Sequence, residues 1–220
     1  MRQYNRDVHF TTIFFDLDDT LYPSTSGLWP MLKQRMTRYM IERLKIPEND
    51  VPRLRETYFR TYGTTLRGLQ ANHAVDVQDY LAYVHDVPLD EYIRPDPVQQ
   101  SVLSGLSTRN LIFTNADANH ARRVLRTLMI EDYFVGIIDV NRMEPYCKPS
   151  PEAFGLAMQA SGESDPARCM MLDDLPHTTR AARDFGWYSV LFGASDPGTD
   201  ADAACPDWPR LASLLNGGRT

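Results

Sequence analysis

The chain has 220 residues, and its 43% of hydrophobic and 24% of charged residues are typical of a globular protein with a sizeable core. Its formal net charge of −6 argues against nucleic-acid binding, which needs a basic face for the phosphate backbone. Residues 1–10 have no apolar core of signal-peptide length, and no run approaches the roughly eighteen apolar residues of a membrane span, so we expect neither secretion nor membrane insertion.

The cysteines indicate a reducing compartment. They are odd in number and widely spaced, and no CxxC pair occurs, which favours free thiols over a disulfide framework or a zinc site. The three are Cys147, Cys169 and Cys205. We therefore expect a cytoplasmic protein.

The first predicted element is a buried strand that ends in a cluster of acids. Residues 11–22 read TTIFFDLDDTLY, in which the apolar run 13–15 is followed by Asp16, Asp18 and Asp19. Side chains alternate along a strand, so Asp16 and Asp18 are expected on the same side, where two like charges raise each other's pKa or bind a cation. Asp19 would point away and anchor the following turn. The alternative is a polar loop that happens to carry three acids.

Residues 23–94 are expected to be entirely helical. Leu28, Leu32, Met36 and Met40 recur at helical spacing, and Pro47 and Gly63 end two of the segments. No stretch of this block has the pattern of a strand. The predicted helices cover residues 28–45, 48–62, 66–73 and 76–85.

Beyond the proline-punctuated stretch 94–100, helices and strands alternate. This pattern implies a parallel sheet with helices on both faces, which the first strand can join only if residues 23–94 are an insertion. We therefore predict an α/β fold: a doubly wound, Rossmann-like core of residues 1–22 and 95–220 with an inserted all-helical domain, residues 23–94. Residues 194–209 are expected to be a surface loop before a last helix at 210–216. The predicted helices are 97–106, 119–129, 151–161 and 178–185, and the strands are 111–115, 134–140, 169–174 and 188–193.

Polar residues follow several of these strands. Because ligands bind at the carboxyl ends of the strands in an open α/β sheet, these residues are expected to converge on one edge. Acids, a hydroxyl and a lysine together suit a divalent cation and a phosphoryl group. The converging residues are Asp16, Asp18, Thr114, Asn115, Lys148, Asp173 and Asp174.

The acids are expected to divide the chemistry between them. Mg²⁺ prefers carboxylate oxygens, so Asp16 would bind it with Asp173 and Asp174, and Asp18 would add its backbone carbonyl. Asp16 can attack phosphorus and form an aspartyl-phosphate. The Asp18 side chain can protonate the leaving alkoxide and then deprotonate the attacking water.

Three further residues are expected to bind the phosphorylated substrate: Thr114, Asn115 and Lys148. The hydroxyl of Thr114, beside Asn115, can bind the phosphoryl oxygens together with nearby backbone N–H groups. Lys148 can offset the negative charge on the nucleophile and on the phosphate as the transition state forms.

Four short stretches resemble, in order, the four motifs of the haloacid dehalogenase superfamily of phosphatases. They are DLDDT at residues 16–20, Thr114-Asn115, Lys148-Pro149 and Asp173-Asp174. The resemblance implies that the helical block is the small cap domain of that superfamily's first cap class. One departure is Thr178, at the position four residues after Asp174 where the superfamily often has Asp or Asn; it puts the outer shell of the metal site in doubt.

A finer resemblance is to the pyrimidine 5′-nucleotidase branch of this superfamily. It rests on residues 14–36, on YGTTLRGL at 62–69 and on LIFTNADANHARRVL at 111–125. It implies nucleoside monophosphates such as UMP and CMP as substrates, with a cap that closes over the sheet edge and contributes residues to base binding. The candidates, which can equally be ordinary cap packing, are Tyr62, Thr64, Arg67 and His73.

Several other functions stay open. The protein could be a phosphatase of sugar phosphates or other small esters, a receiver-like phospho-signalling domain, a dehalogenase or a non-catalytic nucleotide-binding descendant. The intact acid set favours phosphoryl transfer, because a dehalogenase needs neither a second aspartate nor a metal. The expected partner is a small phosphorylated substrate, with no nucleic acid and no membrane, and the oligomeric state is left open.

Side chains outside the motifs have simpler expected roles. Cys147, beside Lys148, could have a lowered pKa, but packing is the favoured interpretation. His177 could face the cleft or solvent. Arg122, Arg123 and Arg126 form a basic run on a helix and are expected to be solvated.

Overall fold

The computed structural model describes residues 10–216. The expectation that no signal sequence is present concerns residues 1–10, of which only Phe10 lies in the described range. The predicted core domain, residues 1–22 and 95–220, is described from residue 10 to residue 216. In this range no helix combines the length and apolar character needed to cross a bilayer. The three cysteines are buried and unpaired.

Six parallel strands within the described residues form one sheet in the order β3-β2-β1-β4-β5-β6. The first strand therefore lies inside the sheet, hydrogen-bonded to β2 and β4, which follow the helical block in the sequence. This confirms the predicted α/β core. The strands are β1 (Thr12–Phe15), β2 (Arg109–Phe113), β3 (Gly136–Ile138), β4 (Cys169–Asp173), β5 (Tyr188–Phe192) and β6 (Ala203–Cys205).

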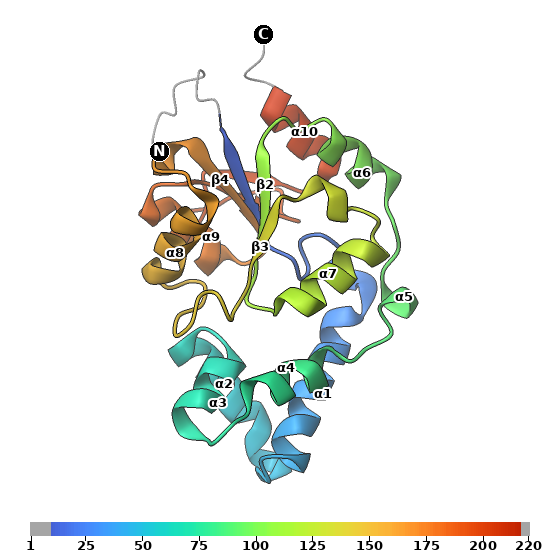
Figure 1. The fold of residues 1–220 in the computed structure, drawn as a ribbon, viewed down its shortest axis with the longest axis vertical. Helices are drawn as coiled ribbons and strands as arrows, with labels where there is room; N and C mark the ends of the chain where they lie inside the picture. The colour runs from blue at the N-terminus through green and yellow to red at the C-terminus, as the bar shows by residue number, and fades with distance from the viewer. Residues whose placement is uncertain (1–9, 217–220) are drawn as a thin grey trace.

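Helices cover both faces of the sheet (Figure 1). The side chains of β1 alternate between two hydrophobic cores: Ile13 and Phe15 belong to one, and Phe14 stacks on Trp187 in the other, with ring centroids 4.1 Å apart. The first core contains α6 (Pro97–Ser104), α7 (Ala118–Thr127) and α10 (Trp208–Asn216). The second contains α8 (Pro151–Ser161) and α9 (Pro176–Phe185).

The first four of the α-helices between β1 and β2 lie together at the carboxyl end of the sheet, below it in Figure 1. Gly63, with a φ of 83°, ends the second of these helices, and the Thr64 hydroxyl caps the third. We call this group of helices the cap. The division of the chain into domains at residues 22/23 and 94/95 stays a prediction. The helices are α1 (Leu28–Glu42), α2 (Val51–Tyr62), α3 (Thr65–Asn72) and α4 (Val77–His85), and the short α5 (Leu89–Tyr92) leads back to the core.

The structure corrects some predicted boundaries. Residues 194–209 are not all loop, because β6 pairs with β5 in parallel and α10 begins at Trp208. The three residues of β6 are not β-branched and do not alternate between polar and apolar. Their sequence therefore does not predict a strand, which is defined by its hydrogen bonds to β5. The strand expected at 134–140 is limited to Gly136–Ile138, and a 3₁₀ turn at Glu48–Asp50 precedes α2.

The close packing of α3 on α2 can be tested at Gly68. A Cβ at this position would lie 2.2 Å from Cβ and Cγ of Tyr58. We expect Gly68→Ala to lower the free energy of unfolding by about 1–3 kcal/mol through overpacking, as measured by urea denaturation. Gly155→Ala in α8 is the matched control: its Cβ would meet nothing within 4 Å, so the helix should gain about 0.5–1 kcal/mol. Equal effects of the two substitutions would contradict this packing.

Candidate active site

Asp16 lies at the centre of the acid cluster. It is the first residue after β1, and its backbone N–H donates to the carbonyl of Leu172 in β4 at 2.9 Å. Because β1 and β4 are neighbours, their carboxyl ends bring Asp16 to Asp173 and Asp174. One carboxylate oxygen of each lies within 4.8 Å of the others, a spacing at which three oxygen donors can share one cation.

Lys148 is buried among these acids, with 4% exposure. Its Nζ donates to Oδ1 of Asp16 at 2.6 Å and to Oδ2 of Asp173 at 2.7 Å. Asn115 fixes the lysine backbone from both sides: its amide donates to the Lys148 carbonyl at 3.0 Å and its Oδ1 accepts from the Lys148 N–H at 2.9 Å. Asn115, predicted to bind substrate, is therefore used to position Lys148.

Burial governs the charge state of the cluster. It raises the pKa of Asp16 well above its usual range, and the neighbouring carboxylates add to this while Lys148 opposes it. Burial and Asp173 likewise raise the pKa of Asp174 to about 7. Burial alone would lower the pKa of Lys148, but its two ion pairs raise it. Three carboxylates and one ammonium leave two formal negative charges, which fits a divalent cation bound by oxygen donors.

Asp18 lies in a different environment, outside this cluster. Its Oδ1 accepts a hydrogen bond from the hydroxyl of Tyr22 at 2.7 Å and lies 3.4 Å from Nε2 of His120. Burial by itself would raise the pKa of Asp18, but the hydrogen bonds from His120 and Tyr22 lower it. The surroundings of these two carboxyl groups, which follow the same strand, thus shift their pKa values in opposite directions.

Three residues of the site were not identified from the sequence. The buried hydroxyl of Thr20 lies 3.3 Å from Oδ2 of Asp16 and 3.5 Å from Oδ1 of Asp174. Its place in the DLDDT stretch was a usable signal. Tyr22 and His120, which bind Asp18, lie in two of the stretches that carry the finer resemblance, but their contact with Asp18 depends on how the chain folds back.

The remaining core residues have internal contacts. The buried Thr114 hydroxyl accepts from the N–H of Ala116 at 3.0 Å and keeps its own proton to donate. Asp19 has a positive φ of 59°, as suits a turn, and burial raises the pKa of its carboxyl to about 6. Thr178 is 2% exposed in the first turn of α9.

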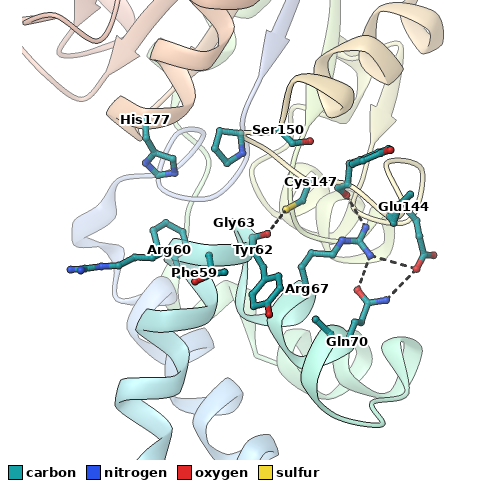
Figure 2. A pocket seen from close by; sticks show the side chains of 15 residues that line it. Phe59, Arg60, Tyr62, Gly63, Arg67, Gln70, Glu144, Cys147, Ser150 and His177 are labelled. Carbon is teal, nitrogen blue, oxygen red and sulfur yellow. Dashed lines mark hydrogen bonds and ion pairs between the residues drawn. The ribbon is translucent and has the colours of Figure 1, made fainter.

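A cavity of about 880 Å³ lies between the cap and the core. Figure 2 shows Phe59 and Tyr62 of α2 on its cap side, facing Cys147 and Ser150 of the loop that carries Lys148. The cavity is lined by Phe59, Arg60, Thr61, Tyr62, Gly63, Arg67, Gln70, Ala71, Glu144, Pro145, Tyr146, Cys147, Pro149, Ser150 and His177. The lining includes Cys147 and Pro149, the chain neighbours of Lys148, but not Lys148 or the clustered acids.

The four cap residues predicted to bind substrate differ in their surroundings. Tyr62 lines the cavity and is 37% exposed. Arg67 reaches the cavity wall, but its guanidinium donates to the carbonyls of Val140 and Tyr146, both at 2.8 Å. Thr64 and His73 are outside the lining: the former caps α3, and Nε2 of the latter lies 2.8 Å from the Tyr58 hydroxyl. A role of these side chains in substrate binding stays a prediction.

The side chains outside the motifs are partly as expected. Cys147 is buried, its thiol donates to the carbonyl of Tyr62 at 3.3 Å, and burial raises its pKa. His177 is half-buried and lines the cavity against Phe59. Arg122, Arg123 and Arg126 are exposed as expected, and Arg123 also donates to the carbonyls of His85 and Val87, both at 2.6 Å. These hydrogen bonds depend on the fold, which brings α7 next to the segment that follows α4.

Solved structures show the same fold at low sequence identity. A haloacid dehalogenase-like hydrolase, YfnB from Bacillus subtilis, matches with a TM-score of 0.63 and 15% identity over 94% of this chain and 99% of that one. A 2-haloacid dehalogenase from Pseudomonas syringae matches with a TM-score of 0.61 and 18% identity, again over 94% and 99%. At these identities the likeness concerns the fold alone.

One curated relative is closer in sequence. Phosphate metabolism protein 8 of Saccharomyces cerevisiae is 31% identical over 192 residues, which cover 81% of this chain and 60% of the yeast protein. The chain thus spans about 60% of that relative's length. The family model for haloacid dehalogenase-like hydrolases matches residues 10–186, a stretch that includes the whole cluster of acids with Lys148. This chain belongs to the haloacid dehalogenase-like hydrolase family.

Proposed function

We propose that this protein is a Mg²⁺-dependent phosphomonoesterase that works through an aspartyl-phosphate on Asp16. The observation that carries the proposal is the contrast between the two aspartates. Asp16 lies beside a buried lysine in a cation-binding cluster, while Asp18 stands apart with its own donors. A nucleophile and a proton-transfer group are thereby separated within one short segment.

The metal ligands would be the carboxylates of Asp16, Asp173 and Asp174, with the backbone carbonyl of Asp18. When bound, Mg²⁺ would neutralise charge on the phosphoryl oxygens. Thr20 would orient the Asp16 and Asp174 carboxylates through its hydroxyl. Thr178 offers a hydroxyl where related proteins often have a carboxylate or an amide.

In the first step a carboxylate oxygen of Asp16 attacks phosphorus, and the bond from phosphorus to the ester oxygen breaks. The departing alcohol takes a proton from Asp18, and Lys148 and Thr114 stabilise the charge of the phosphoryl group. In the second step Asp18 removes a proton from water, which attacks phosphorus and releases inorganic phosphate from Asp16. Asp18 is held ionised in the free protein, and the negative charge of a bound ester favours its protonation.

Nucleoside 5′-monophosphates, pyrimidine ones foremost, are the proposed substrates. A cavity of about 880 Å³ is in the size range of small-ligand sites. Its wall offers the exposed aromatic rings of Phe59, Tyr62 and Tyr146 for stacking, and Gln70 and Glu144 for hydrogen bonds to a base. The name of the yeast relative points to phosphate metabolism and supports phosphoryl chemistry without specifying a nucleotide. Sugar phosphates and other small esters are the alternative.

A dehalogenase is the second candidate, because proteins of that activity share the fold. It would use Asp16 to attack carbon. Asp18 and the pair Asp173-Asp174 favour phosphoryl transfer, since attack on carbon requires no proton donor and no metal. The cytoplasmic location stays a prediction, supported by three buried, unpaired thiols.

Asp16→Asn tests the nucleophile. The amide keeps the shape of the side chain but cannot attack phosphorus, so we expect turnover of phosphate esters to fall by about a thousandfold or more, measured as phosphate release. Asp19→Asn is the matched control, because asparagine also tolerates a positive φ and the mechanism does not use this carboxylate. Retained activity in Asp16→Asn would contradict the mechanism.

A substrate panel tests the specificity. Phosphate release in Mg²⁺ buffer is measured for UMP, CMP, purine nucleotides and sugar phosphates, and halide release is measured for 2-chloropropionate. We expect the pyrimidine monophosphates to give the highest kcat/KM. Equal values for sugar phosphates would remove the nucleotidase proposal and leave the phosphatase, whereas halide release would favour the dehalogenase.

Lys148→Met tests the charge balance of the metal site. Asp16 and Asp173 lose their cation, so the free energy of unfolding in EDTA should fall by about 3 kcal/mol or more. Because a bound divalent cation replaces part of the lost charge, Mg²⁺ should raise the melting temperature more in this variant than in the unmodified protein. Lys33→Met, at an exposed cap position, is the control. An equal Mg²⁺ effect in all three proteins would place the ion elsewhere.

A further inference from the structure

His120 is a buried side chain that the proposed mechanism leaves without a role. It lies in the first turn of α7 with 1% exposure. Its Nε2 is 3.4 Å from Oδ1 of Asp18, at the long end of the range for a hydrogen bond. Its Nδ1 is buried and has no partner among the described residues. An aliphatic side chain would fill the same space without burying an unpaired nitrogen, so space filling does not explain the histidine.

The ring of His120 is held by a second buried histidine. It stacks on the ring of His85, with centroids 4.1 Å apart and planes 16° from parallel. Nδ1 of His85 lies 2.6 Å from Oδ2 of Asp117, whose Oδ1 accepts from the His120 N–H at 3.1 Å. Asp117 therefore fixes the backbone of His120 directly and its ring through His85.

His85 is the last residue of the cap helix α4. Its carbonyl accepts from Arg123, which lies one turn after His120 on α7. The orientation of His120 is thus tied to the place where the chain returns from the cap to the core.

The two donors around Asp18 meet at one oxygen. The hydroxyl of Tyr22 and Nε2 of His120 both lie against Oδ1, and no donor within residues 10–216 is recorded on Oδ2. The Asp18 side chain keeps 18% exposure. Because an ionised carboxylate only accepts, His120 must carry its proton on Nε2. The occupied Oδ1 leaves Oδ2 as the oxygen free to hold a proton.

We infer that His120 is a positioning residue for proton transfer: with Tyr22 it occupies Oδ1 of Asp18, fixes the carboxyl plane and leaves Oδ2 to exchange the proton with the leaving group. The stacked His85 keeps the His120 ring in place from the cap side. The inference rests on the proposed function, in which Asp18 is the proton donor and acceptor.

The dependence of the reaction rate on the leaving group distinguishes a role of His120 in positioning Asp18 from a role in supporting the fold. An alkoxide needs a proton as it leaves, whereas 4-nitrophenolate is a stable anion and does not. The quantity to compare is kcat/KM, because it reports formation of the aspartyl-phosphate and excludes its hydrolysis. The substrates are UMP and 4-nitrophenyl phosphate, with glucose 6-phosphate in place of UMP if the panel shows that UMP is not turned over.

His120→Leu should lower kcat/KM for the alkyl ester by about 10- to 100-fold and for the aryl ester by less than about threefold. His120→Gln, whose amide can place an N–H near the position of Nε2, should recover most of the loss. Arg126→Gln, an exposed position on the same helix, is the control and should match the unmodified protein with both esters. The aryl activity also reports that each variant is folded.

Equal losses with both esters would mean that His120 only supports the fold, and no loss with either would mean that it does nothing for Asp18; both results overturn the inference. If His120→Leu fails to fold, the same comparison is made with Tyr22→Phe and His85→Phe, and absence of a leaving-group effect in both overturns it. Asp18→Asn isolates the underlying proposal. If this variant shows no leaving-group effect, the acid role of Asp18 itself is wrong, whatever His120 does.

Discussion

The buried ion pairs of Lys148 are the constraint on which the site depends. An ammonium group taken out of water is stable only if its partners are close and well aligned, and here two carboxylates lie 2.6 and 2.7 Å from Nζ. The sheet supplies these partners because β1 and β4 are adjacent. Asn115, at the end of β2, holds the lysine backbone through two hydrogen bonds. Residues at the ends of three strands thus contact Lys148. These residues meet because β2, β1 and β4 are neighbours in the sheet.

The same strand end produces two acids with different properties. Asp16 continues the line of β1 into the buried cluster, where desolvation raises its pKa. Two residues later the chain has left the strand, and Asp18 meets α7 and the Tyr22 hydroxyl, whose hydrogen bonds outweigh burial and lower its pKa. The difference comes from which element each side chain faces and not from the residue type.

Much of this could be predicted from local patterns. The apolar run of β1, the alternation after residue 100 and the rule that ligands bind at the carboxyl ends of strands suffice to group Asp16, Lys148 and Asp173. What could not be predicted depends on contacts between distant segments. β6 is defined by its pairing with β5. The hydrogen bonds of the exposed Arg123 to the carbonyls of His85 and Val87, and the contact of His120 with Asp18, arise only when distant segments come together. The cap residues show the same limit, because Arg67 uses its donors on core carbonyls.

Two of the contacts between the cap and the core lie beside the candidate active site. At one, Arg67 binds carbonyls of residues 140 and 146, and Gly63 packs so closely that a Cβ would lie 2.9 Å from Cys147 Sγ and 3.0 Å from the Lys148 carbonyl. At the other, His85 stacks on His120 beside Asp18. The first attachment adjoins Lys148, which pairs with Asp16, and the second includes His120, which lies beside Asp18. Contacts that hold the cap on the core therefore also form part of the surroundings of both Asp16 and Asp18.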